Sequence, residues 1–122
     1  MPVRRWYLSL AAIAAAALLL RLAHLAEIVD TPMVAVLLGD ARMYDGWARQ
    51  IASGEWLGTQ VFYQAPLYPY VLGVFYSVAG PTVVGARALQ AVFGSAACVL
   101  LAVAGRQFFT ARVGLVAGAM LA

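Results

Sequence analysis

The sequence has a single cysteine, no lysine and few charged side chains of either sign. Cys98 alone forms no disulfide within the chain and supplies no cysteine-rich metal site. Charged residues make up 11% of the chain, whereas soluble domains carry about a quarter. No basic run with interleaved aromatic residues, the pattern of a nucleic-acid-binding surface, is present. These absences exclude a disulfide-stapled domain and a nucleic-acid-binding protein.

Hydrophobic side chains fill the chain instead. They make up 65% of its 122 residues, and the mean hydropathy is +0.88. Both values lie far outside the range of small soluble domains. The composition therefore predicts an all-α integral membrane protein, with the lipid bilayer as its main partner.

Two apolar stretches, residues 6–28 and 82–105, are long enough to cross a hydrocarbon core of about 30 Å at about 1.5 Å per residue. Residues 113–122 cover only about half of that thickness. We therefore expect a third span to begin there, and the chain to be the N-terminal piece, residues 1–122, of a longer multi-span protein. Gly114 and Gly118 have the G-x-x-x-G spacing that supports close helix packing.

The arginine pair before an alanine-rich run also fits a secretory signal peptide. Arg21 directly after the run, and the lack of a small-x-small cleavage site, argue against this alternative.

Residues 29–81 form the polar loop between the spans. The run Asp30-Thr31-Pro32 ends the first span, because proline disfavours helical geometry in the residue before it. Helices are predicted at about 41–53 and 66–79, the second too short to cross a membrane. Both are interpreted as juxtamembrane helices. The loop between them is rich in groups that favour the membrane interface, namely Trp56, Gln60, Phe62, Tyr63 and Gln64.

The helix at 41–53 is amphipathic. Asp45 and Arg49 lie on its polar side in the favourable acid-before-base order, and Ser53-Gly54 provides a stop signal. Such a helix is expected to lie flat at an interface. Its apolar side carries Met43, Tyr44, Trp47, Ala48, Ile51 and Ala52.

The arginines predict the topology. Arg4 and Arg5 precede the first span, and Arg106 and Arg112 bracket a short turn after the second. The positive-inside rule makes this side cytoplasmic. The loop at 29–81, which holds most of the carboxylates, is then outside the cell membrane.

Several polar residues near the spans have two readings each. Asp40 either caps the helix that follows it or has a chemical role. Arg21, with His24 and Glu27, either reaches the headgroups with a local ion pair or contributes to a polar site. Arg87 either points outward or faces a polar cavity.

Four motifs follow one another along the chain: GDARMYDGWARQIASGEW at 39–56, APLYPY at 65–70, GARALQ at 85–90 and GRQFF at 105–109. Their order resembles the N-terminal part of bacterial membrane glycosyltransferases of the GT-C fold, a group that includes protein O-mannosyltransferases and lipid A aminoarabinose transferases. The resemblance covers nearly all of this chain but only the first portion of such enzymes.

The resemblance implies an inner-membrane enzyme that takes a sugar from a polyprenyl-phosphate donor at the outer face of the membrane. The family's essential aspartate and the aromatic residue after it fall on Asp40 and Tyr44. A carboxylate can take the proton of an acceptor hydroxyl, and guanidinium groups suit a phosphate leaving group. The candidates for phosphate binding are Arg42, Arg87 and Arg21. Further transmembrane helices would complete the site, and the pattern leaves open whether a metal takes part.

The chain departs from the family's subgroups at three positions. Met43 and Ala65 stand where aminoarabinose transferases have arginine and lysine, and Ala41 stands where protein O-mannosyltransferases commonly have glutamate. A bacterial member of unspecified substrate is therefore the interpretation. The alternative is a small membrane assembly or transport subunit without chemistry, in which Asp40 only caps a helix.

Overall fold

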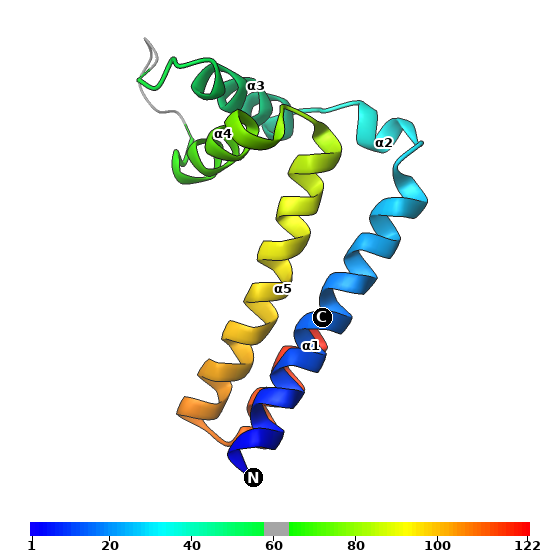
Figure 1. Ribbon diagram of the computed structural model, residues 1–122, viewed down its shortest axis with the longest axis vertical. Helices are drawn as coiled ribbons and strands as arrows, with labels where there is room; N and C mark the ends of the chain where they lie inside the picture. The colour runs from blue at the N-terminus through cyan, green and yellow to red at the C-terminus, as the bar shows by residue number, and fades with distance from the viewer. Residues whose placement is uncertain (58–63) are drawn as a thin grey trace. The chain divides into compact units, whose positions relative to one another are not determined.

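The computed structural model describes residues 1–57 and 64–122, and all the regular structure in these residues is helical. Gln60, Phe62 and Tyr63, which the sequence assigned to an interfacial loop, lie outside the described residues. The helices follow one another as α1 (Val3–Ile28), α2 (Pro32–Ala35), α3 (Asp40–Ala52), α4 (Leu67–Ala79), α5 (Val83–Phe108) and α6 (Ala111–Leu121) (Figure 1).

The chain divides into two compact units. The long-helix unit consists of Met1–Glu27 and Ala88–Ala122, and thus of α1, most of α5 and α6. The short-helix unit is Ile28–Arg87 and holds α2, α3, α4 and the first turn of α5.

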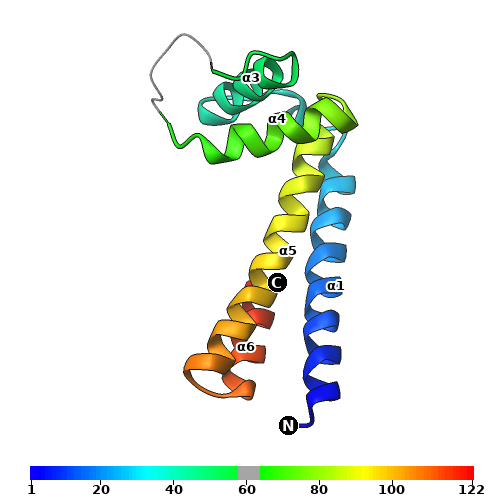
Figure 2. The same cartoon turned by 60° about the vertical axis from the view of Figure 1, so that its left-hand side comes forward.

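In the long-helix unit α1 and α5 run antiparallel. The start of α1 packs against the end of α5 through buried Trp6, Leu10 and Ala102, and Leu115 of α6 packs against the same cluster. Figures 1 and 2 show the N-terminus beside the turn that joins α5 to α6.

Helices α1 and α5 are long and apolar enough to cross a membrane, judged by length and composition. Their most apolar stretches have mean hydropathies of 2.0 and 1.9, and only 11% and 28% of these stretches are buried. The prediction of two helices long and apolar enough to cross a membrane is confirmed.

The second long helix is longer than predicted. Arg106, predicted to border a short turn, belongs to the last turn of α5, and the turn contracts to Phe109 and Thr110. The Thr110 hydroxyl accepts a hydrogen bond from the Val113 amide at 3.2 Å and so caps α6. This cap lets α6 begin at Ala111, close to the end of α5.

Residues 32–35 form one helical turn ahead of α3 that the sequence did not predict. Pro32 stands at its first position, where a missing amide hydrogen costs nothing.

Helix α6 packs closely against α5 at two glycines. A Cβ atom at Gly114 would collide with the Ala102 carbonyl oxygen, and one at Gly118 would lie 2.7 Å from the Cys98 carbonyl oxygen. The spacing of the two glycines thus serves close helix contact, as predicted.

In the short-helix unit α3 packs against α4. Ala48 and Ile51 of α3 are buried, as are Leu72 and Tyr76 of α4. Part of the apolar side of α3 therefore packs against α4, and the placement of α3 at a membrane interface stays a prediction. Met43, placed on the apolar side by its spacing, is half exposed at 51%.

We expect Gly114→Ala to destabilise the protein by about 1–3 kcal/mol, because the added methyl group meets backbone atoms that cannot move aside. The matched control is Gly46→Ala, since a Cβ atom at Gly46 meets nothing within 4 Å. The control should be neutral or stabilising by up to about 1 kcal/mol. Thermal unfolding followed by circular dichroism in detergent measures both. Equal stability of the two variants would contradict the close α5–α6 contact.

Candidate functional site

Asp40 is exposed and stands inside the first turn of α3. The capping position belongs to Gly39, whose φ of 54° suits glycine and whose carbonyl oxygen accepts hydrogen bonds from the amides of Arg42 and Met43. The reading of Asp40 as the helix N-cap is therefore wrong, because Gly39 already fills that place. A carboxylate in this turn still benefits from the positive end of the helix dipole.

Gln64 holds the Asp40 side chain. Its Nε2 atom donates a hydrogen bond of 2.7 Å to Asp40 Oδ1 across 24 residues of sequence. The second oxygen, Oδ2, accepts no hydrogen bond from the described residues. The contact orients the carboxylate and leaves one oxygen for another proton donor. Sequence spacing gave no sign of this pairing, because Gln64 follows a loop.

The other predicted site residues of the short-helix unit are spread over two helices. Arg42 is exposed on α3, and Arg87 is half-buried in the first turns of α5. The ring of Tyr44 meets that of Tyr68 edge to face, with 5.5 Å between their centroids. Tyr44 therefore links α3 to α4. Neither arginine forms an ion pair within residues 1–57 and 64–122.

Arg21 belongs to the long-helix unit. Its guanidinium donates hydrogen bonds to the carbonyl oxygens of Ala17 at 3.0 Å, Ala122 at 2.9 Å and Leu121 at 3.1 Å. The side chain also lies across Gly94 of α5, where a Cβ atom would come within 2.8 Å of Nε. Arg21 thus connects all three helices of its unit. His24 and Glu27, its predicted companions, form an exposed pair at 4.0 Å.

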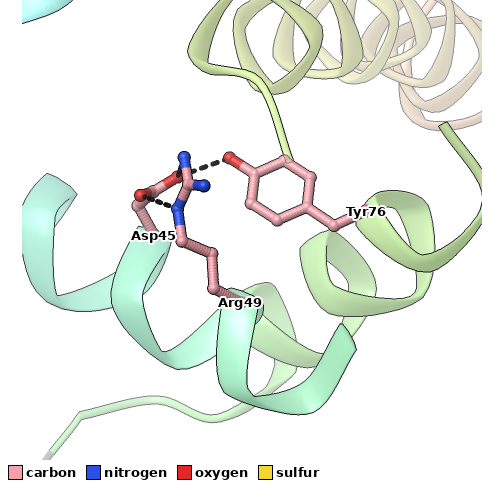
Figure 3. A network of polar contacts seen from close by, with 3 residues as sticks. All are labelled: Asp45, Arg49 and Tyr76. Atoms are coloured by element: carbon pink, nitrogen blue, oxygen red, sulfur yellow. Dashed lines mark hydrogen bonds and ion pairs between the residues drawn. The ribbon is translucent and has the colours of Figure 1, made fainter. Parts of the chain in front are cut away.

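The strongest polar cluster is one that the sequence showed only in part. Arg49 and Asp45 form the expected pair, with 2.7 Å between Nε and Oδ2. The hydroxyl of Tyr76 on α4 donates a further hydrogen bond of 2.6 Å to Asp45 Oδ1 (Figure 3). The Arg49 guanidinium also lies 5.6 Å from the centre of the Tyr76 ring. Asp45 therefore faces α4, not the open polar side that its spacing predicted.

The environment of Tyr76 shifts its acidity. Burial raises the pKa of Tyr76, and the hydrogen bond to the negatively charged Asp45 raises it further. The hydrogen bond with Asp45 likewise raises the pKa of Arg49. Both donors of the cluster therefore stay protonated at neutral pH, as the two hydrogen bonds require.

An aromatic group lies at the far end of α3. The ring of Tyr70 is 6.0 Å from that of Trp47 and 6.1 Å from that of Trp56, and its hydroxyl donates a hydrogen bond to the Trp56 carbonyl oxygen. These contacts tie the residues after α3 back onto α4.

The described residues hold no group of three or more histidine, cysteine, aspartate or glutamate side chains arranged to bind a metal ion. No protein-family model, no curated protein and no solved structure matches this chain. The functional assignment therefore depends on the residues themselves.

Removing the buried hydroxyl tests the α3–α4 connection. We expect Tyr76→Phe to destabilise the short-helix unit by about 1.5–3 kcal/mol, the usual value of a hydrogen bond to a charged group. Tyr7→Phe is the control, because Tyr7 is exposed at 63% and belongs to the long-helix unit. Thermal unfolding followed by tryptophan fluorescence measures the change. Wild-type stability of Tyr76→Phe would show that the hydrogen bond between Tyr76 and Asp45 does not stabilise the short-helix unit.

The acidity of Tyr76 predicts an alkaline transition. Its pKa in the folded protein lies above the ordinary 10.0, so its contribution to stability is complete below pH 10 and is lost as pH rises above that value. The fall in unfolding temperature above pH 10 should be smaller in Tyr76→Phe. An identical fall in both proteins would assign the transition to other groups.

Proposed function

We propose that this chain is the N-terminal part of a bacterial membrane glycosyltransferase that uses a polyprenyl-phosphate sugar as donor. The observation that carries the proposal is the Asp40 carboxylate, which is exposed, stands at the start of α3 and is oriented by Gln64 through one oxygen. Asp40 is also the position on which the sequence motif of these enzymes places an essential carboxylate.

In the proposed reaction Asp40 acts as general base. An acceptor hydroxyl approaches Oδ2 and gives up its proton while its oxygen forms a bond to the anomeric carbon of the sugar. The bond between that carbon and the phosphate oxygen breaks, and polyprenyl phosphate leaves with the electron pair. Fixing Oδ1 to Gln64 supports this role, because a carboxylate of set orientation loses less freedom when the acceptor binds.

The leaving phosphate is negatively charged and calls for guanidinium groups. Arg42 and Arg87 belong to the same unit as Asp40 and carry no ion-pair partner there, which supports a role in binding this charge. Tyr44 is proposed to hold the sugar or the acceptor beside Asp40. Arg21 stays a prediction, and its hydrogen bonds to helix carbonyl groups favour a structural role.

The proposal includes a location. We assign α1 and α5 as crossings of the bacterial inner membrane, with the N-terminus cytoplasmic and the short-helix unit on the periplasmic side. The support is the separation of charge: the long-helix unit has Glu27 as its one acidic side chain, whereas Arg4, Arg5, Arg106 and Arg112 all belong to it.

The catalytic role is tested by Asp40→Asn in the natural full-length protein. Asparagine can still accept the hydrogen bond from Gln64 but takes no proton, so we expect transfer of labelled sugar from the polyprenyl-phosphate donor to fall by about a hundredfold or more. The control is Glu55→Gln, which neutralises another exposed carboxylate of the same unit and should leave transfer unchanged. Activity of Asp40→Asn near the wild-type level would count against the role of Asp40. A wild-type protein that transfers no sugar from any polyprenyl-phosphate donor would favour the non-enzymatic subunit.

The topology is tested by cysteine labelling in a Cys98→Ser background. Ser53→Cys, an exposed position just after α3, should react with a membrane-impermeant maleimide in intact spheroplasts. Gln107→Cys, exposed near the end of α5, should react only after the membrane is opened. The reverse pattern would contradict the periplasmic assignment.

A further inference from the structure

We propose that the end of the long-helix unit that carries the chain's N-terminus is a binding site for the phosphate headgroup of an acidic phospholipid. The site consists of Arg4, Arg5, Arg106 and Arg112, assembled around Trp6. The inference does not depend on the glycosyltransferase proposal, because it concerns the opposite ends of α1 and α5 from those that lead into the short-helix unit.

Trp6 packs where the start of α1, the end of α5 and the start of α6 meet, and these arginines belong to those helix ends. The Trp6 ring is buried, with 3% of its surface exposed, and packs with Ala102 of α5 and Ala111 of α6. Arg106 stacks its guanidinium over the Trp6 ring at 4.6 Å from the ring centre. Such a stack favours a fixed position for the cation. The remaining arginines flank these contacts directly in sequence: Arg4 and Arg5 precede Trp6, and Arg112 follows Ala111.

All four guanidinium groups are exposed and lack an acidic partner. Each of the four residues is exposed in the structure, and none forms an ion pair within the described residues. Glu27, the one acidic side chain of the unit, stands near the other end of α1, about 30 Å along the helix from Arg5 at 1.5 Å per residue. The charge at this end is therefore left for a ligand to neutralise.

Helix stability does not explain three of these cations. Arg4 and Arg5 stand in the first turn of α1 and Arg112 in the first turn of α6, and neither turn contains an acid. A cation near the positive end of a helix dipole is unfavourable. Only Arg106, in the last turn of α5, is placed where the dipole favours it. A bound anion would offset the cost at the other three.

The exposed aromatic residues and the long apolar helices at this end indicate that the bound anion belongs to a lipid. Phe108 and Phe109 beside the site are exposed at 76% and 74%, and Tyr7 at 63%. These aromatic rings suit the boundary between headgroups and acyl chains. The two long helices that end here have the length and composition of membrane spans. Clusters of arginine at the end of a span recognise anionic headgroups, and the planar guanidinium pairs with two phosphate oxygens at once.

The test measures phosphatidylglycerol binding to the purified protein by native mass spectrometry, with phosphatidylcholine as the neutral lipid of matched chains. The wild type should bind phosphatidylglycerol more tightly than phosphatidylcholine. Arg106→Gln and Arg112→Gln should each weaken phosphatidylglycerol binding by about fivefold, which corresponds to about 1 kcal/mol for each arginine near an anionic surface. Arg49→Gln, which removes the same charge from α3 of the other unit, should leave it unchanged.

Three results would overturn the proposal. The first is equal affinity of the wild type for the two lipids. The second is wild-type affinity for phosphatidylglycerol in both Arg106→Gln and Arg112→Gln, with helical content by circular dichroism confirming that the variants fold. The third is displacement of the lipid by inorganic phosphate at constant ionic strength, which would make the site one for free phosphate.

Discussion

The pairing of a buried hydroxyl with a carboxylate holds the short-helix unit together. Tyr76 is 2% exposed, so its hydroxyl must find a partner inside the protein, and Asp45 supplies it at 2.6 Å. Arg49 balances the charge of Asp45 from the same helix. Because the partners come from α3 and α4, the two helices have one favoured register. The position of Asp40 at the start of α3 depends on this register.

Glycine residues set the distance between packed helices, and they do so in both units. A Cβ atom at Gly73 of α4 would lie 2.7 Å from the Cβ atom of Ile51, so α3 approaches α4 more closely than any larger residue allows. Gly114 and Gly118 let α6 approach α5 in the long-helix unit. Close backbone contact increases the packing area between short helices that would otherwise bury little surface. In both units small residues set the distance, and polar or aromatic contacts set the register.

The sequence predicted the helices well and their partners poorly. Period and length located α1, α3, α4 and α5 to within a few residues, and the burial of Ala48 and Ile51 followed from the period of α3. That period does not say what covers the apolar side, and only the structure shows that α4 packs against Ala48 and Ile51. The link between Asp45 and Tyr76 spans 31 residues, and local spacing carries no information about such a pair.

The candidate site was likewise predicted only in part from the sequence. Its central residue, Asp40, came from a motif, whereas its orienting partner, Gln64, became visible only in the structure. The capping interpretation of Asp40 was wrong because Gly39, with a positive φ, already ends the preceding extended segment. A glycine before an aspartate can signal such a start, since it takes a conformation that other residues avoid.

Charge is distributed between the units in a way that fits two environments. The short-helix unit contains Asp30, Asp40, Asp45 and Glu55. The long-helix unit contains Arg4, Arg5, Arg106 and Arg112, and Arg106 stacks over Trp6. Under the proposed function the acidic unit serves a neutral hydroxyl and a phosphate leaving group. Under the further proposal the basic end of the long-helix unit binds the headgroup of an acidic lipid.

The register of α3 on α4 depends most directly on the coupling between Asp45 and Tyr76, which a double-mutant cycle measures. The free energy of unfolding is determined for the wild type, Asp45→Ala, Tyr76→Phe and the double variant, from denaturant titrations followed by tryptophan fluorescence. We expect the losses of unfolding free energy in the two single variants to sum to more than the loss in the double variant. The difference, the coupling energy, should be about 1–3 kcal/mol. Effects that add to within about 0.5 kcal/mol would show that the two side chains act independently, and the fixed register proposed for α3 would then be wrong.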